Sequence, residues 1–186
     1  MGRQYAQVSL GLWLLLLLPW MLLSRQQVTE SSASTVAAVV RPTYEGITLA
    51  DYFDNGRLHY TLSAASLQQQ SDNNLAFTRV DVVVMADSDT DSFWRITSNR
   101  AELAGDNLLF KGRVHVREQV ACPVELDSSQ FLYHVGAGTF SVEDGLEYRR
   151  ARDKVVAKRA TGVFSSGRIK VFQGVSSYNP DGQDCT

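Results

Sequence analysis

Gly56-Arg-Leu-His-Tyr-Thr-Leu-Ser-Ala64 is the stretch of sequence that decides the fold. Leu58, Tyr60 and Leu62 alternate in it with polar side chains. A period of two is that of a β-strand with one buried face, whereas an amphipathic helix repeats every 3.6 residues. Residues 54–56, Asp-Asn-Gly, are a turn signal, so the sequence predicts a strand that begins just after a tight turn.

The same period recurs along the chain as far as residue 175, with turn residues between the runs. The apolar positions change parity between Phe77 and Val80. A strand cannot change faces without an irregularity, so a bulge or break is predicted near Thr78 and Arg79. Further runs with this period lie at residues 94–103, 108–124, 131–135 and 146–175.

Two segments allow more than one assignment. Residues 108–124 hold one parity and predict one long strand or two strands in line. Residues 149–158 have a helix-like composition, but Val155-Val156 and the surrounding strands favour β-structure. Strands do not alternate with helices anywhere, so the fold class is all-β, as a sandwich, a jelly roll or a related open roll.

The run from Ala6 to Leu23 contains 18 residues without a charge. A helix of that length reaches about 27 Å, close to the thickness of the hydrocarbon core of a bilayer. A single transmembrane anchor is therefore predicted, and a signal peptide cut near residues 32–34 is the alternative. The predicted organisation is a cytoplasmic N-terminus (1–5), the anchor (6–23), a flexible stalk (24–41), an exported folded domain (42–175) and a disordered tail (176–186).

Composition and spacing exclude several kinds of site. The net charge of −2 gives no indication of nucleic-acid binding. Cys122 and Cys185 lack the spacing of a metal site, and an exported location permits a disulfide, although two free thiols are favoured. Residues 87–91, Asp-Ser-Asp-Thr-Asp, open like a calcium loop, but Ser92 and Ser98 stand where Gly and Glu are required. No metal and no cofactor are predicted.

No arrangement of residues indicates catalysis. No Ser or Cys stands in a nucleophile elbow, and a hydrolase is disfavoured. Seven titratable side chains are considered for catalysis. His59, His115 and His134 are expected on strands, at or beside the solvent-facing positions. The other four are Glu102, Glu118, Glu125 and Glu143. A cluster of basic residues has the chemistry to bind phosphate or carboxylate, although a solvated strand face is the favoured interpretation. The cluster comprises Arg149, Arg150, Arg152, Lys154, Lys158 and Arg159.

The aromatic residues at inward parity have two interpretations. They fill an ordinary core, or they line a groove between open sheets that takes acyl chains. The residues concerned are Tyr60, Phe77, Trp94, Phe110, Phe131, Tyr133 and Phe140.

Taken in order, these features resemble the LptC family, membrane-anchored periplasmic components of lipopolysaccharide export in Gram-negative bacteria. The resemblance begins with the short apolar span and a polar stalk that ends at Pro42-Thr43-Tyr44. It continues through the strand Gly56–Ala64, which is similar to the family's G-x-L-x-Y-x-L-x-A pattern. The other matching segments are Ser71-Asp72, Phe77-Thr78, Trp94-Arg-Ile96, Ala101-Glu-Leu103, Leu109 to Val116 around Gly112, and Ser165-Ser166-Gly167.

The resemblance implies a twisted, boat-like β jelly roll with an open apolar interior, following one N-terminal transmembrane helix. It implies no enzymatic activity. Such a protein accepts lipopolysaccharide from the inner-membrane ABC transporter of LptB, LptF and LptG and passes it to the bridge protein LptA. The implied location is the inner membrane, with most of the chain in the periplasm. The alternative function is a membrane-anchored scaffold that holds partner proteins without binding lipid.

The resemblance also implies two sets of site residues. The lipid-binding residues are Leu58, Tyr60, Leu62, Phe77, Val82, Trp94, Ile96, Phe110, Val114, Phe131 and Tyr133. The partner-binding residues are Tyr44 at an N-terminal edge, Gly56 and Gly162 at turns beside the docking ends, and Arg168, Ile169, Lys170, Val171 and Phe172 at a C-terminal edge. Accordingly, Phe77→Glu is expected to weaken lipid binding with the fold intact, and Gly162→Arg to reduce docking more than lipid binding.

Overall fold

The computed structural model describes residues 41–71, 73–85, 92–178 and 185. The chain divides after Val40, and the described residues all belong to the second unit. This unit contains ten β-strands: β1 Thr43–Tyr52, β2 Leu58–Ser71, β3 Asn74–Met85, β4 Phe93–Ala104, β5 Asn107–Glu118, β6 Val124–His134, β7 Thr139–Val142, β8 Leu146–Arg150, β9 Asp153–Val163 and β10 Arg168–Tyr178. The predicted all-β class is confirmed for this part of the chain.

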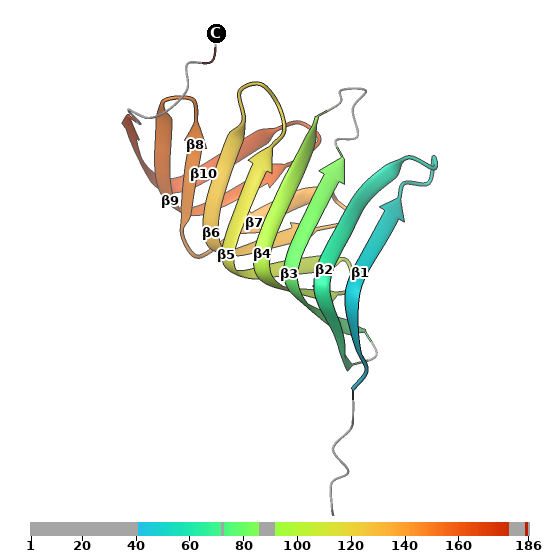
Figure 1. Cartoon of the computed structure of the whole chain (residues 1–186). Helices are drawn as coiled ribbons and strands as arrows, with labels where there is room; N and C mark the ends of the chain where they lie inside the picture. Colours follow the sequence, from blue (N-terminus) through green and yellow to red (C-terminus); the bar gives the residue numbers. More distant parts are fainter. Residues whose placement is uncertain (1–40, 72, 86–91, 179–184, 186) are drawn as a thin grey trace, which may run out of the picture. The chain divides into compact units, whose positions relative to one another are not determined.

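The ten strands form one antiparallel sheet (Figure 1). Their order is β1-β2-β3-β4-β5-β6-β7-β9-β10, and the short strand β8 also lies between β6 and β9. Strands adjacent in the chain are adjacent in the sheet from β1 to β7, as expected for a chain whose runs are separated by tight turns. Strands β1 and β10 each pair on one side only, so they are the two edges of the sheet.

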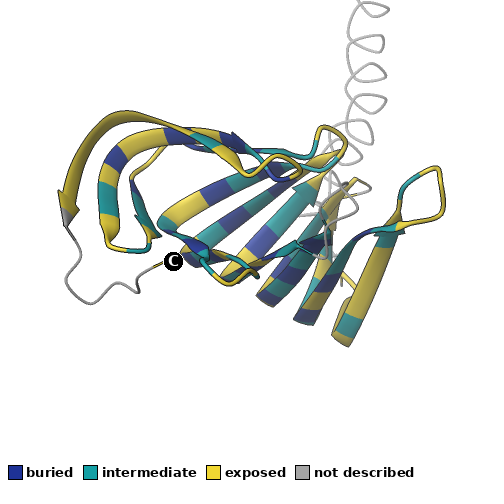
Figure 2. Ribbon diagram, turned by 90° about the horizontal axis from the view of Figure 1, so that it is seen from above, coloured by how far each residue is buried: buried dark blue, intermediate teal, exposed yellow. Residues whose placement is uncertain are grey.

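A row of irregular residues crosses the first five strands and bends them. Gly46 (φ 61°), Arg79 (φ 49°) and Gly112 (φ 95°) adopt left-handed backbone conformations in β1, β3 and β5. The register places Ala65 of β2 and Asn99 of β4 between them. The predicted irregularity near Thr78-Arg79 is therefore confirmed. Figure 2 shows that the sheet curls over on itself.

The bend brings the inner faces of the strand halves together around one hydrophobic core. Large side chains that are almost fully buried come from β2 to β8. Two hydrogen bonds join residues far apart in the chain across this core: Trp94 Nε1 donates to the carbonyl of Phe164, and the Tyr133 hydroxyl contacts His59 Nε2. Burial at about 25 cal/mol per Å² of apolar surface makes this core the main source of stability.

The structure corrects one strand assignment and extends another. Residues 108–124 are not one strand or two in line, because β5 ends at Glu118 and β6 returns antiparallel from Val124. Pro123 has no backbone N–H to donate to a neighbouring strand. Val120 is 40% exposed, so the apolar alternation that continues past Glu118 does not mark a buried strand face. Residues 149–158 lie in β8, the following turn and β9, as the β-assignment predicted, and β10 continues to Tyr178, beyond the predicted end at 175.

The expectation of two free thiols is wrong. Cys122, in the turn between β5 and β6, forms a disulfide with Cys185 near the C-terminus, with Cα atoms 5.5 Å apart. The sequence could not place them together because they lie 63 positions apart and meet only in the folded chain. Part of the segment predicted as a disordered tail is therefore held to the domain.

Removing this cross-link should destabilise the domain. Closing a loop of 63 positions lowers the entropy of the unfolded chain, so the double variant Cys122→Ser/Cys185→Ser should lose about 4 kcal/mol of unfolding free energy. Urea denaturation with and without reductant measures this loss. An equal loss in wild type after reduction is the matching control, and no loss in either would contradict a stabilising role.

No helix among the described residues is long and apolar enough to cross a membrane. The predicted anchor at 6–23 and most of the predicted stalk lie outside those residues, as does the Asp-rich turn at 87–91.

Candidate functional site

The predicted lipid-binding residues gather on the inner face of the curled sheet. Nine of them are at most 1% exposed: Leu62, Phe77, Val82, Trp94, Ile96, Phe110, Val114, Phe131 and Tyr133. Leu58 and Tyr60, at the start of β2, are half-buried. The inward parity is therefore confirmed, but the expected open interior is not found at these nine residues, because side chains from the facing strand halves fill it.

The centre of this interior is a cluster of aromatic rings. Phe131 stacks on Phe140 with ring centroids 4.9 Å apart and meets Phe110 edge-on at 6.1 Å. Phe164, which the sequence analysis did not select, lies within 5.0–5.3 Å of Phe140, Trp94 and Tyr133. It belongs to the turn between β9 and β10 and is only 3% exposed. A large apolar residue directly before Ser165-Ser166-Gly167 was the signal that could have found it.

Gly162 faces the aromatic cluster. It lies inside β9, paired with Phe140 and Ile169, and not at a turn as expected. A Cβ atom added there would lie 2.3 Å from Phe140 Cζ. Gly162 therefore allows Phe140 to pack against the β9 backbone, and it is not a surface docking residue. Gly56 does occupy a turn, with φ 80° and open space around it.

A polar network lies beside the apolar interior, near the β1 edge. His59 is 8% exposed, which corrects the expectation that it lies at or beside the exposed parity. Its Nδ1 is 3.0 Å from Asp51 Oδ2, its Nε2 is 3.1 Å from the Tyr133 hydroxyl, and its ring stacks on Phe53. Burial, and then the nearby charge of Asp51, raises the pKa of Tyr60, and burial also raises the pKa of Tyr133.

Asp51, Phe53, His59 and Tyr60 border a cavity of about 360 Å³. Its walls come from the turn between β1 and β2 on one side and from the hairpin turns at Gly105 and Gly136 on the other. The strand halves on either side of the bend therefore approach one another at this end of the interior. The cavity is polar and apolar in similar measure, so it differs from the sealed aromatic cluster.

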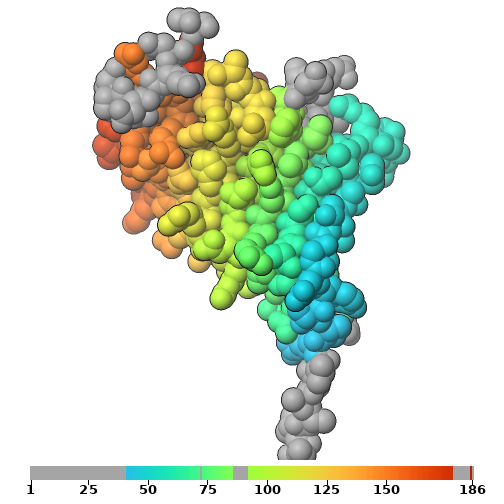
Figure 3. Space-filling model, in the orientation of Figure 1, coloured from blue at the N-terminus to red at the C-terminus, as the bar shows by residue number. Residues whose placement is uncertain are grey.

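The two edge strands carry most of the large apolar side chains that are exposed. On β1 these are Tyr44 (54%), Leu49 and Tyr52, and β1 borders the face shown in Figure 3. On β10 they are Val171, Phe172 (41%) and Val175. The other predicted docking residues of β10 are Arg168 and Lys170, which are exposed, and Ile169, which is half-buried. Each edge thus combines unpaired backbone groups with apolar contacts.

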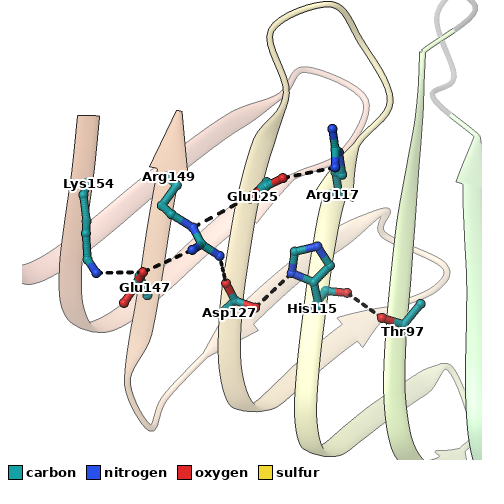
Figure 4. A network of polar contacts seen from close by, with 8 residues as sticks. All are labelled: Thr97, His115, Arg117, Glu125, Asp127, Glu147, Arg149 and Lys154. Atoms are coloured by element: carbon teal, nitrogen blue, oxygen red, sulfur yellow. Dashed lines mark hydrogen bonds and ion pairs between the residues drawn. The ribbon is translucent and has the colours of Figure 1, made fainter. Parts of the chain in front are cut away.

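Two members of the basic cluster, Arg149 and Lys154, form ion pairs on the outer surface of β5, β6, β8 and β9 (Figure 4). Arg149 contacts Glu125, Asp127 and Glu147, and Lys154 lies 2.9 Å from Glu147. Another member, Arg159, lies over the ring of Phe172 at 5.8 Å. These contacts favour a solvated strand face over a phosphate site, in agreement with the favoured interpretation.

Among the described residues, no group of three or more His, Cys, Asp or Glu side chains is arranged to hold a metal ion. The His115–Asp127 pair at 2.9 Å continues into the ion pairs of Arg149. His115, Asp127 and Arg149 thus form one connected set of polar contacts on the outer surface.

Comparisons with known proteins identify the family. A search of curated protein sequences found no match. A crystal structure of LptH, the LptA-homologous periplasmic component of the lipopolysaccharide transport device of Pseudomonas aeruginosa, is similar with a TM-score of 0.49 and 10% identity, over 60% of this chain and 80% of that one. The model of the family described as lipopolysaccharide-assembly, LptC-related matches residues 11–179. Because that match spans most of the 186 residues, the chain belongs to the LptC-related family of lipopolysaccharide-assembly proteins, and its role lies in lipopolysaccharide transport.

Proposed function

We propose that this protein receives lipopolysaccharide from the inner-membrane ABC transporter of LptB, LptF and LptG and passes it to the bridge protein LptA. In this function it is an anchored transfer component, held in the inner membrane by residues 6–23, with its β-domain in the periplasm. It is not an enzyme, and the energy comes from its partner. Family membership supports this role.

The observation that carries the proposal is the continuous apolar inner face of the curled sheet. Burying an acyl chain is favourable by about 0.8 kcal/mol per CH₂ group. The burial of several CH₂ groups therefore offsets the free-energy cost of separating a few packed side chains. The interior is filled in this structure, with nine of its predicted lipid contacts at most 1% exposed. Lipid entry therefore requires the two layers to separate locally.

The edges supply the docking surfaces in this proposal. Strand β1, with Tyr44, faces the periplasmic domains of the transporter, and β10, with Phe172, pairs with an edge strand of LptA. An unpaired strand adds another chain's strand through backbone hydrogen bonds, and exposed apolar side chains add contact area. The apolar residues concentrated on these two edges support this arrangement.

The filled core is also the specific observation that favours the scaffold alternative. A protein that only holds its partners in register needs two edges and a stable core, and it needs no lipid within that core. The two functions differ in whether lipopolysaccharide contacts inner-face residues during transport.

Photo-crosslinking in cells that make lipopolysaccharide tests this difference. A photo-reactive phenylalanine replaces Tyr60, which is half-buried at the inner face, and Ser63 serves as the control because it is exposed on the same strand. The expected result is a lipid adduct at Tyr60 and none at Ser63. Adducts at neither position, with the protein folded and membrane-bound, would favour the scaffold.

Photo-reactive residues at Tyr44 and Phe172 test the docking edges in the same cells. We expect the first to capture a transporter subunit and the second to capture LptA. Capture of LptA at Tyr44 and of a transporter subunit at Phe172 would reverse the proposed direction of transfer. Capture of neither protein would remove the edges from the proposal.

A further inference from the structure

The aromatic residues of the core differ in how firmly the backbone holds them. Trp94, Phe110, Phe131 and Phe140 lie in strands that pair on both sides. Moving one of them out of the core would break hydrogen bonds to two neighbouring strands. Phe164 is equally buried, but it lies in the β9–β10 turn.

Few backbone contacts hold Phe164. Its backbone N–H donates to the carbonyl of Gly138 at 3.1 Å. Its carbonyl accepts from Gly167 N at 3.2 Å and from Trp94 Nε1 at 3.3 Å. The next three residues, Ser165 to Gly167, are exposed, so the turn itself is anchored chiefly by the Phe164 ring.

The ring nevertheless occupies a central place between the layers. It contacts Trp94 of β4 on one side and Tyr133, Phe131 and Phe140 of β6 and β7 on the other. If the ring moved out, an apolar slot lined by these four aromatic residues would remain. Such a slot has the chemistry of a site for a saturated hydrocarbon chain.

We propose that Phe164 occupies the place into which an acyl chain of the transported lipid inserts, and that the β9–β10 turn lifts from β7 as a lid when lipid enters. This inference rests on the proposed function and adds a site to it. It explains how a filled core admits lipid: one turn moves, and the strand ladders of β2 to β6 stay intact. The acyl chain then replaces the contacts that the Phe164 ring made.

A reversible tether tests the lid directly. Thr139 of β7 and Val163 of β9 are register partners next to Phe164. The bond from Phe164 N–H to Gly138 makes them a non-hydrogen-bonded pair, whose Cα atoms lie about 4.5 Å apart, within the range of a disulfide. The full-length variant Thr139→Cys/Val163→Cys therefore locks the end of β9 to β7 when oxidised.

The probe is purified lipopolysaccharide, and the measurement is the amount retained per protein after gel filtration. The oxidised variant should retain several-fold less than the same variant after reduction. Wild type with and without reductant is the control, because reduction also opens the Cys122–Cys185 disulfide. Equal retention by the oxidised and reduced variants would overturn the lid while leaving lipid binding in place. Absence of retention by wild type would overturn the proposed function itself.

A second variant distinguishes a plug from an ordinary core residue. Phe164→Leu removes ring volume and should speed lipopolysaccharide uptake several-fold, because less must be displaced. Val156→Ala, at an exposed site on β9, the strand that precedes this turn, is the matched control and should leave uptake unchanged. Slower or unchanged uptake by Phe164→Leu would mean that the residue serves packing alone.

Discussion

Gly162→Arg should abolish folding of the β-domain instead of selectively weakening docking. Even the single Cβ atom of Gly162→Ala would lie 2.3 Å from Phe140 Cζ and 3.0 Å from the carbonyl oxygen of Arg168. Overpacking a filled core costs about 1–3 kcal/mol for a small group, and we expect the upper end for alanine. Arginine adds a charge to the same position, and the combined cost approaches the total stability of about 5–15 kcal/mol that domains have.

Urea denaturation of Gly162→Ala, with Phe140→Leu and the double variant, measures this clash. The double variant should recover much of the lost stability, because the smaller side chain at 140 leaves room for the new methyl group. Gly56→Ala is the matched control: its turn has open space, so only the backbone strain of about 1–2 kcal/mol is expected. A stable Gly162→Arg domain that lost only partner binding would return Gly162 to the docking surface.

The elements of this fold were predictable where local rules decide them. The alternation of Leu58, Tyr60 and Leu62 identified a strand with one buried face. The parity change between Phe77 and Val80 predicted the irregularity that β3 has at Arg79. Both inferences depend only on neighbouring residues, whose side chains must alternate along a strand.

Features that depend on contacts between distant segments were not predictable. A period of two tells which side chains face inward, but it does not tell how closely two inner faces approach, so it left a filled core and an open groove undecided. His59 has an inward partner, Tyr133, that lies 74 positions away, and Cys122 has one 63 positions away. Gly162 looked like a turn glycine because only the folded sheet places Phe140 beside it.

Phe77→Glu should also unfold the domain at neutral pH, contrary to the expectation that the fold would stay intact. Phe77 is 1% exposed on β3, between Leu67 and Ala101 on the neighbouring strands. Losing a buried phenylalanine costs about 3–5 kcal/mol, and an unpaired carboxylate in its place adds several more. Partial recovery on acidification follows, because burial raises the pKa of the introduced carboxyl in the folded state above its unfolded value. The folded state then binds more protons between the two pKa values, so the penalty shrinks as pH falls through that window.

Thermal unfolding followed by circular dichroism between neutral and mildly acidic pH tests this, with Phe77→Gln as the uncharged control of similar shape. The glutamine variant should be destabilised at every pH, whereas the glutamate variant should gain stability relative to it on acidification. A Phe77→Glu domain as stable as wild type at neutral pH would show that water reaches the inner face at β3. The interior would then be an open trough in solution, and lipid would enter without any movement of Phe164.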